Sequence, residues 1–114
     1  ERGSISQLLK GKVMIKSVLL ITCKKGAVRA NHWHKKDTHY VYMLKGRMRY
    51  FHQDMRNDNS KKESVIVKEG EIIYTPSETA HYMKFLENSI FLALSTESRE
   101  QKKYEKDTVR IQLN

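Results

Sequence analysis

Short apolar runs separated by turn residues predict a chain built almost entirely of β-strands. Val, Ile, Tyr and Phe recur in segments of strand length. Turn dipeptides that end in glycine, Lys25-Gly26, Lys45-Gly46 and Glu69-Gly70, separate some of these segments. Helical periodicity is nearly absent. The expected strands cover residues 13–23, 28–33, 38–44, 47–53, 64–68, 72–75, 80–86, 89–95 and 108–113. This spacing favours a sandwich or barrel that takes up residues 1–114 as one domain.

Two of the expected strands place a histidine beside apolar side chains on one face. The odd positions of residues 39–43 share a face, as do those of residues 81–85, and each set begins with a histidine. Such alternation is typical of a barrel interior that ends in a polar mouth. Between strands, residues 54–60 are expected to form a polar loop, and the charged residues 98–106 a short helix or a turn.

Length and cysteine content narrow the class of protein. With 114 residues, 39% of them hydrophobic, the chain can build one compact core. No apolar run approaches the roughly 18 residues that a membrane span requires. The single cysteine, Cys23, lies in an apolar run and excludes an internal disulfide, so we expect a buried structural thiol in a reducing, cytoplasmic setting.

The positive net charge of the chain indicates which kind of partner it binds. The formal net charge is +9, but the lysines are scattered in pairs rather than gathered in a basic helix, and aromatic residues are not interleaved with them. This distribution argues against nucleic acid as the partner. It favours a field that attracts an anionic small molecule, such as a phosphorylated metabolite.

Four of the five histidines form a spaced pattern. His32 and His34 are two apart, so on a strand both rings point to the same face. His39 follows on the next strand, and His81 lies beyond the polar loop. Because converging imidazoles suit ions such as Zn, Fe, Mn and Ni, the pattern predicts a divalent metal site, with a metal-free pocket for proton transfer as the alternative.

The glycines around these histidines complete a first motif. Gly26, His32, His34, His39 and Gly46, separated by five, one, four and six residues, resemble the first motif of the cupin family. The resemblance implies a double-stranded β-helix, the jelly-roll barrel, and metal ligation by His32, His34, His39 and His81. In that family a carboxylate usually occupies the position of His39. Its replacement makes the ligand set neutral and favours softer ions.

A second motif supports the same family. Gly70, then Pro76 after five residues, then His81 five positions later, resemble the second cupin motif. Glu78 stands where that motif usually has a glycine, and Phe85 where it usually closes with asparagine. Small cupins of this kind usually pair through edge strands, which would otherwise be exposed, so we expect a homodimer.

A narrower resemblance indicates an activity. Residues 29–35, Arg-Ala-Asn-His-Trp-His-Lys, resemble the Arg-x-x-His-x-His-Lys strand of sugar-nucleotide ketoisomerases and related cupins of capsule and O-antigen biosynthesis. Residues 1–5 and 95–107 resemble the two ends of such proteins. The resemblance implies an isomerase or epimerase of a keto sugar, linked to a nucleotide or phosphate, in surface polysaccharide biosynthesis.

That chemistry assigns expected roles to particular side chains. Moving a carbonyl along a sugar needs a base, an acid and a group that stabilises the enediolate. We expect acid–base chemistry from His34 and His81, hydroxyl donors from Tyr50 and Tyr74 at the barrel mouth, and phosphate binding by Arg29 and Lys35. Trp33, between two histidines, should point to the opposite face. A metal-dependent dioxygenase and a non-catalytic small-ligand-binding cupin are the alternative functions.

Overall fold

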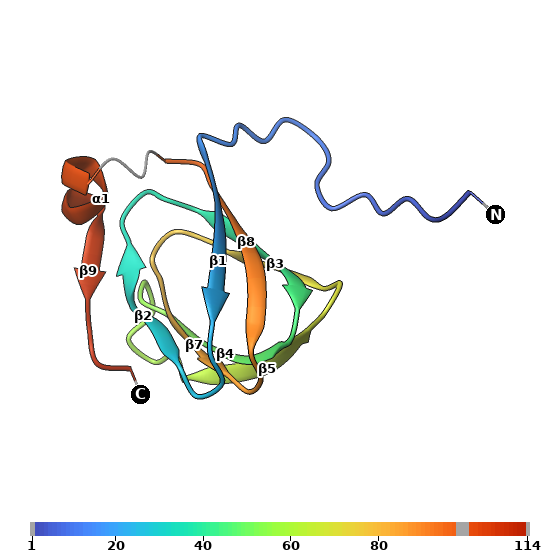
Figure 1. The fold of residues 1–114 in the computed structure, drawn as a ribbon. Coiled ribbons are helices and arrows are strands. Elements are labelled where there is room, and N and C mark those ends of the chain that lie inside the picture. The colour runs from blue at the N-terminus through green and yellow to red at the C-terminus, as the bar shows by residue number, and fades with distance from the viewer. Residues whose placement is uncertain (1, 98–100, 114) are drawn as a thin grey trace.

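The computed structural model describes residues 2–97 and 101–113 and contains two antiparallel sheets that curve around a common interior (Figure 1). The first sheet has the strand order β1-β8-β3-β6, and the second the order β5-β4-β7-β2-β9. The strands are β1 (Ser17–Cys23), β2 (Val28–His34), β3 (His39–Lys45), β4 (Arg47–Asp54), β5 (Glu63–Lys68), β6 (Ile72–Thr75), β7 (Thr79–Phe85), β8 (Ser89–Ser95) and β9 (Thr108–Arg110). The all-β jelly-roll architecture predicted from the sequence is confirmed.

Alternating side chains divide the interior into an apolar end and a histidine end. Along β3, His39 comes first and is followed on the same face by Val41 and Met43, all of them buried. Along β7, His81 precedes Met83 and Phe85 in the same way. Burial of such apolar side chains contributes about 1.5–3 kcal/mol each and stabilises the scaffold on which the histidines are held. Cys23 also lies in this apolar core, as expected.

Two strands are shorter than the sequence predicted, because each loses its partner. We expected a strand over residues 13–23, but β1 begins at Ser17, since its neighbour β8 ends at Ser95. The preceding residues 2–16 have no regular structure and extend away from the barrel in Figure 1. We expected a final strand over residues 108–113, but β9 ends at Arg110, opposite His32, where β2 becomes irregular.

A short helix, α1 (Gln101–Asp107), joins the barrel to β9. The sequence predicted a helix or turn over residues 98–106, of which 98–100 lie outside the described residues. In the described part of the chain, no helix is long and apolar enough to cross a membrane. Because β9 pairs with β2, the helix is held beside the strand that carries His32 and His34. The extent of the domain, residues 1–114, stays a prediction.

Candidate functional site

Three strands bring the four predicted histidines into one buried cluster. His32 and His34 come from β2, His39 from β3 and His81 from β7, and none is more than 7% exposed. The ring centroid of His32 lies 4.6 Å from that of His34 and 4.8 Å from that of His81. The ring of His39 lies 4.9 Å from that of His81. The four imidazoles therefore contact one another inside the barrel.

A bulge in β2 turns Arg29 to the same side as His32. The register with β7 runs from Arg29–Met83 to Ala30–Tyr82 and then jumps to His32–His81, which leaves Asn31 unmatched. Ala30 and Asn31 have φ angles of 77° and 59°, in the left-handed region that is uncommon for residues other than glycine. Without the extra residue, Arg29 and His32 would point to opposite faces.

The C-terminal segment fixes the orientation of His34. Thr108 Oγ1 donates its only hydrogen to the carbonyl oxygen of Tyr104 at 2.6 Å and lies 3.2 Å from Nδ1 of His34. The hydroxyl must therefore accept from Nδ1–H. A carboxylate oxygen of Asp107 lies 3.7 Å from the same nitrogen and also favours a proton there. These partners assign the lone pair of His34 to Nε2.

The orientation of His81 follows from its own strand. Its Nδ1 lies 3.0 Å from the carbonyl oxygen of Thr79, which can only accept, so Nδ1 carries the proton. Nε2 is then the basic nitrogen, available either to take a proton or to bind a metal. Histidines that ligate metals usually donate their other ring N–H to a carbonyl or a carboxylate in this way.

Two overlapping groups of side chains could hold a metal ion. The ligand atoms of His32, His34 and His81 lie within 4.8 Å of one another, and so do those of His34, Asp37 and His39. Both sets suit Zn or Fe, because three nitrogen or mixed nitrogen and oxygen ligands leave coordination positions open. The buried Asp37 was missed by the sequence argument, although its position between two histidines was a signal. Asp37 can supply a carboxylate ligand in place of the one that His39 replaces in the first cupin motif.

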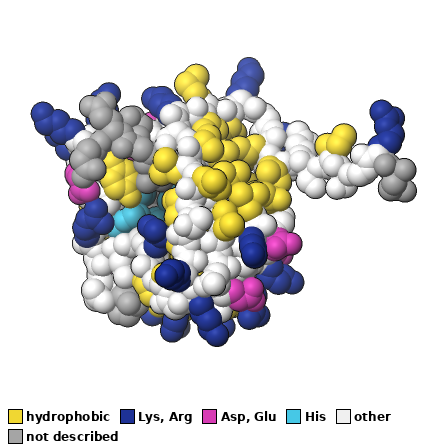
Figure 2. Space-filling model, in the orientation of Figure 1, with side chains coloured by type: hydrophobic (Ala, Val, Ile, Leu, Met, Phe, Trp, Pro, Cys, Tyr) yellow, Lys and Arg dark blue, Asp and Glu magenta, His cyan; other side chains and the backbone are white. Residues whose placement is uncertain are grey.

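A cavity of about 340 Å³ opens onto the cluster, and we name it the histidine pocket. Its lining is mainly apolar, with a few polar groups that converge on it, which is the usual make-up of a ligand site. Figure 2 shows histidine atoms at its opening, beside β1. The lining residues are Leu19, Ile21, Arg29, Ala30, His32, His39, Val41, His81, Met83, Phe91, Ala93 and Tyr104. His34 is not among them and packs behind this wall.

Tyr104 of α1 covers the cluster from the outside. Its ring centroid lies 5.4 Å from that of His34 and 6.4 Å from that of His32. Sequence reasoning assigned no role to Tyr104, Asp107 or Thr108, because nothing in a charged C-terminal stretch shows that it docks beside β2. Of the two strand tyrosines and this helical one, Tyr104 is the one that lines the histidine pocket.

Tyr50, which was expected at the barrel mouth, is buried in the interior and is held as a neutral phenol. Its hydroxyl lies 2.5 Å from Oγ1 of Thr75, and its ring stacks on that of His81 with centroids 6.1 Å apart. Burial raises the pKa of Tyr50 to about 12, although the hydrogen bond from Thr75 opposes part of that rise. A buried phenol of this kind stays protonated, and it can donate, throughout the neutral range.

Tyr74 is placed differently from the expectation. It pairs with Tyr40 across β3 and β6, the two rings lie 4.9 Å apart, and Tyr74 is 48% exposed on the outer face of the first sheet. Because His39 faces inward, its neighbour Tyr40 and the residue opposite it must face outward. The Tyr74 side chain therefore faces away from the histidine cluster, contrary to the prediction that it reaches the barrel mouth.

Arg29 and Lys35 lie in different surroundings. Arg29 lines the histidine pocket, and its Nε donates to Sγ of Cys23 at 2.9 Å. Lys35 is exposed and borders a second cavity. Trp33 pairs with Val109 of β9 and lies out of phase with the two histidines, so it faces away from the cluster, as predicted.

Two facing sheets with a histidine cluster at one end define a class of protein. The family model for cupins matches residues 8–109, and the chain belongs to the cupin family. No curated protein matches the chain. Among solved structures, a 3,4-ketoisomerase from Helicobacter canadensis is similar, with a TM-score of 0.73, 20% identity, and coverage of 94% of this chain and 77% of the other.

Two further structures share the fold. The sugar 3,4-ketoisomerase QdtA from Thermoanaerobacterium thermosaccharolyticum, in complex with TDP, has a TM-score of 0.69 at 21% identity and covers 84% of this chain and 66% of its own. The capsular polysaccharide assembling protein CapF from Staphylococcus aureus has a TM-score of 0.77 at 16% identity and covers 89% of this chain. The chain spans only 27% of that CapF structure. At these identities the likeness shows the fold.

Proposed function

We propose that this cupin isomerises or epimerises a keto sugar linked to a nucleotide or phosphate. The observation that carries the proposal is His81, a buried imidazole at the wall of the histidine pocket whose basic nitrogen is assigned by its bond to Thr79. A general base must be held in one orientation beside its substrate. Fold likeness alone would not support an activity, because cupins carry many chemistries.

The proposed reaction moves a proton between neighbouring carbons. His81 Nε2 takes the proton from the carbon beside the carbonyl, and the electrons of that C–H bond pass to the carbonyl oxygen to give an enediolate. The proton of the neighbouring hydroxyl passes to the former carbonyl oxygen, and His81 returns its proton to the former carbonyl carbon. The neighbouring oxygen thereby becomes the new carbonyl. Arg29, at the same pocket, offers positive charge to the developing oxyanion.

A divalent metal ion belongs to the proposal. Since Nε2 of His81 cannot take a substrate proton while it ligates an ion, the ligands that go with His81 as the base are His34, Asp37 and His39. The other group, His32, His34 and His81, is the alternative. When bound, such an ion polarises a substrate carbonyl as a Lewis acid. The ring orientation described for His34, with Nδ1 protonated and Nε2 free of hydrogen, suits ligation of a metal ion through Nε2.

The similar structures support the choice of substrate. Two of them are named as 3,4-ketoisomerases, and one of those was solved with TDP bound. CapF is named as a capsular polysaccharide assembling protein. By analogy, the substrate of this chain is a sugar nucleotide used for surface polysaccharide, and the protein acts in the cytoplasm.

A homodimer is also part of the proposal, supported by an apolar outer face on the first sheet. Two rows of side chains cross its four strands, and Figure 2 shows hydrophobic atoms gathered over β1 and β8. The rows are Val18, Leu94, Tyr40 and Tyr74, then Leu20, Leu92, Tyr42 and Ile72. An uncharged face can pair with a second copy of itself about a two-fold axis, whereas an exposed patch of this kind is rare on monomers.

Exchange of solvent deuterium tests the activity. The protein is incubated in D₂O with TDP-4-keto-6-deoxyglucose, the ligand of one QdtA structure. Deuterium incorporation beside the carbonyl, followed by mass spectrometry, is expected for the parent and is expected to fall at least about a hundredfold in His81→Asn. Ligand binding without any deuterium uptake would contradict the isomerase and favour a binding module.

A further inference from the structure

A second cavity adjoins the histidine pocket and is rich in lysine. It has a volume of about 350 Å³ and lies between α1, the segment after β2 and the segment after β8. Tyr104 lines both cavities, so the two share one wall. We name this space the lysine cavity after its five cations, Lys16, Lys35, Lys36, Lys103 and Lys106.

The carboxylates of the lysine cavity are largely engaged within the fold. The two oxygens of Asp107 accept from the backbone N–H groups of Lys36 and Asp37, at 2.8 and 3.0 Å. Asp37 in turn accepts from the backbone N–H of Glu97 at 3.1 Å. These hydrogen bonds spread the negative charge of both groups over peptide dipoles and leave less of it to neutralise lysine.

The cavity therefore concentrates positive charge. Its lining holds five lysines against three carboxylates, Asp37, Glu97 and Asp107, an excess of two. Glu97 lies 3.9 Å from Lys16. Within residues 2–97 and 101–113, Lys35, Lys36 and Lys106 make no ion pair with a carboxylate. Ammonium groups gathered in a hollow are a binding site for phosphate oxygens, which they meet as point charges.

The position of the cavity relates it to the histidine cluster. Lys35 directly follows His34, and Asp107 both lines the lysine cavity and lies 3.7 Å from the ring of His34. A ligand with an uncharged ring at one end and phosphates at the other can thus place the ring in the histidine pocket and the phosphates among the lysines. The Tyr104 ring, at the shared wall, lies between the two ends.

We propose that the lysine cavity binds the diphosphate of a nucleoside diphosphate sugar whose sugar ring occupies the histidine pocket. The inference rests on the proposed function and specifies where the anionic part of that substrate lies. It assigns the phosphates to the α1 side of the site. Arg29, which already donates to Cys23, is left to the sugar.

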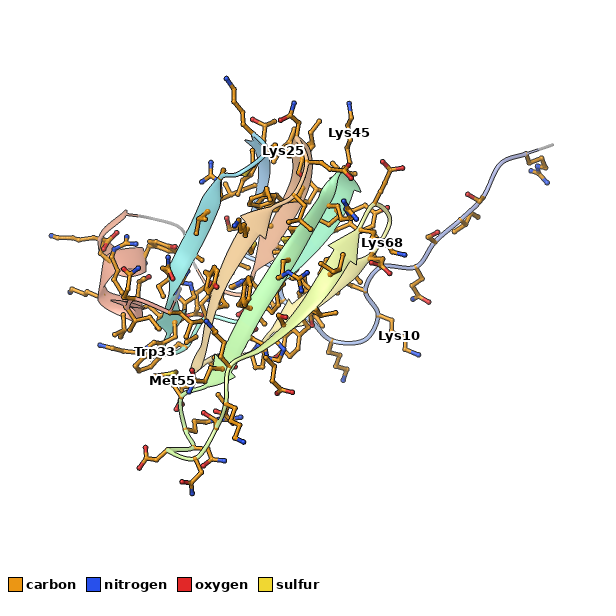
Figure 3. All side chains as sticks on the ribbon, turned by 90° about the horizontal axis from the view of Figure 1, so that it is seen from below. Lys10, Lys25, Trp33, Lys45, Met55 and Lys68 are labelled. Atoms are coloured by element: carbon orange, nitrogen blue, oxygen red, sulfur yellow. The ribbon has the colours of Figure 1, made fainter. Side chains whose placement is uncertain are left out.

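The test is calorimetric titration of the full chain with thymidine diphosphate and with thymidine. We expect the parent to bind thymidine diphosphate and to bind thymidine far more weakly. A double variant, Lys36→Gln with Lys106→Gln, should lose at least about tenfold in affinity for thymidine diphosphate, because charge-assisted contacts are removed. Lys25 and Lys45 lie at the end of the barrel remote from Trp33 (Figure 3). Their double Gln variant removes the same charge and should stay within about twofold.

The outcomes separate this proposal from the activity. Equal affinity in the parent and the Lys36/Lys106 variant, with matching melting temperatures, would overturn it, as would a parent that binds no thymidine diphosphate. Loss of binding in Arg29→Met alone would place the phosphates in the histidine pocket instead. Lysine-dependent binding without deuterium exchange would reject the isomerase but keep the diphosphate site. If the Lys36/Lys106 variant still exchanges deuterium with an unchanged KM, the isomerase would be kept and the diphosphate site rejected.

Discussion

Arg29 and His32 face the same side of β2 although three positions separate them, because Asn31 bulges out of the ladder with β7. The bulge is held through both the backbone and the side chain of Asn31. The carbonyl oxygen of Asn31 accepts from the N–H of Ile111 at 3.0 Å, and its Oδ1 accepts from the N–H of Leu113 at 3.2 Å. The segment that follows β9 thus stabilises the irregular conformation that gives the histidine pocket its guanidinium.

Substitution of Asn31 tests the cost of this conformation. Its φ of 59° is disfavoured for β-branched residues and easy for glycine. Both Asn31→Val and Asn31→Gly lose the bond to Leu113, so the difference between them reports the backbone alone. We expect Asn31→Val to be less stable than Asn31→Gly by about 1–3 kcal/mol in urea denaturation. Equal midpoints would show that the bulge is not under this constraint.

The metal proposal is tested by elemental analysis of the purified protein. We expect close to one equivalent of a transition metal in the parent and a loss of at least about tenfold in the double variant His32→Ala with His34→Ala. His52 belongs to neither ligand group, so His52→Ala should keep its metal. Iron would revive the dioxygenase alternative. A parent that stays empty after supplementation would leave histidines acting without metal.

Asp37→Asn distinguishes the two ligand groups. If the ion lies among His34, Asp37 and His39, the loss of the carboxylate charge should weaken metal binding by about 10–100-fold in competition with a chelator. If the ion lies among His32, His34 and His81, the same variant should bind almost as tightly as the parent.

Tyr50 should make the stability depend on alkaline pH. Its pKa is about 12 in the folded protein and about 10 when unfolded, so between these values the unfolded state has lost a proton that the native state keeps. The free energy of unfolding should therefore fall by about 1.4 kcal/mol for each pH unit from 10 to 12, relative to Tyr50→Phe. Parallel pH profiles for the two proteins would contradict a buried, protonated phenol.

The homodimer is tested through the apolar outer face. Leu20 is 65% exposed in the middle of it, and Leu20→Lys should raise the dimer dissociation constant at least tenfold, since a charge would be buried unpaired. Val28→Lys is the matched control, because Val28 is 42% exposed on the second sheet, outside the apolar outer face. Light scattering at several concentrations measures both. A monomeric parent at micromolar concentration would remove the dimer from the proposal.

The sequence predicted the site where local rules govern it. Strand parity placed His39 and His81 on the inner face, and two-residue spacing put His32 beside His34. It failed for Tyr74, because the facing of β6 depends on its register with β3, which no local pattern reveals. Asp37 was overlooked since a lone carboxylate in a turn is ordinary. Tyr104, Asp107 and Thr108 depend on docking against residues about seventy positions earlier, and propensity says nothing of such pairings.

The contact between Thr108 and His34 joins residues 74 positions apart, and it has a temporal consequence. The ribosome synthesises β1 to β8 before β9, so the two sheets can close before Thr108, whose hydroxyl orients His34, has been added to the chain. At that moment the nascent chain has its histidines in place but lacks the Thr108 contact to Nδ1 of His34. The barrel therefore folds before the histidine site is complete, and the site is completed only when Thr108 docks beside His34.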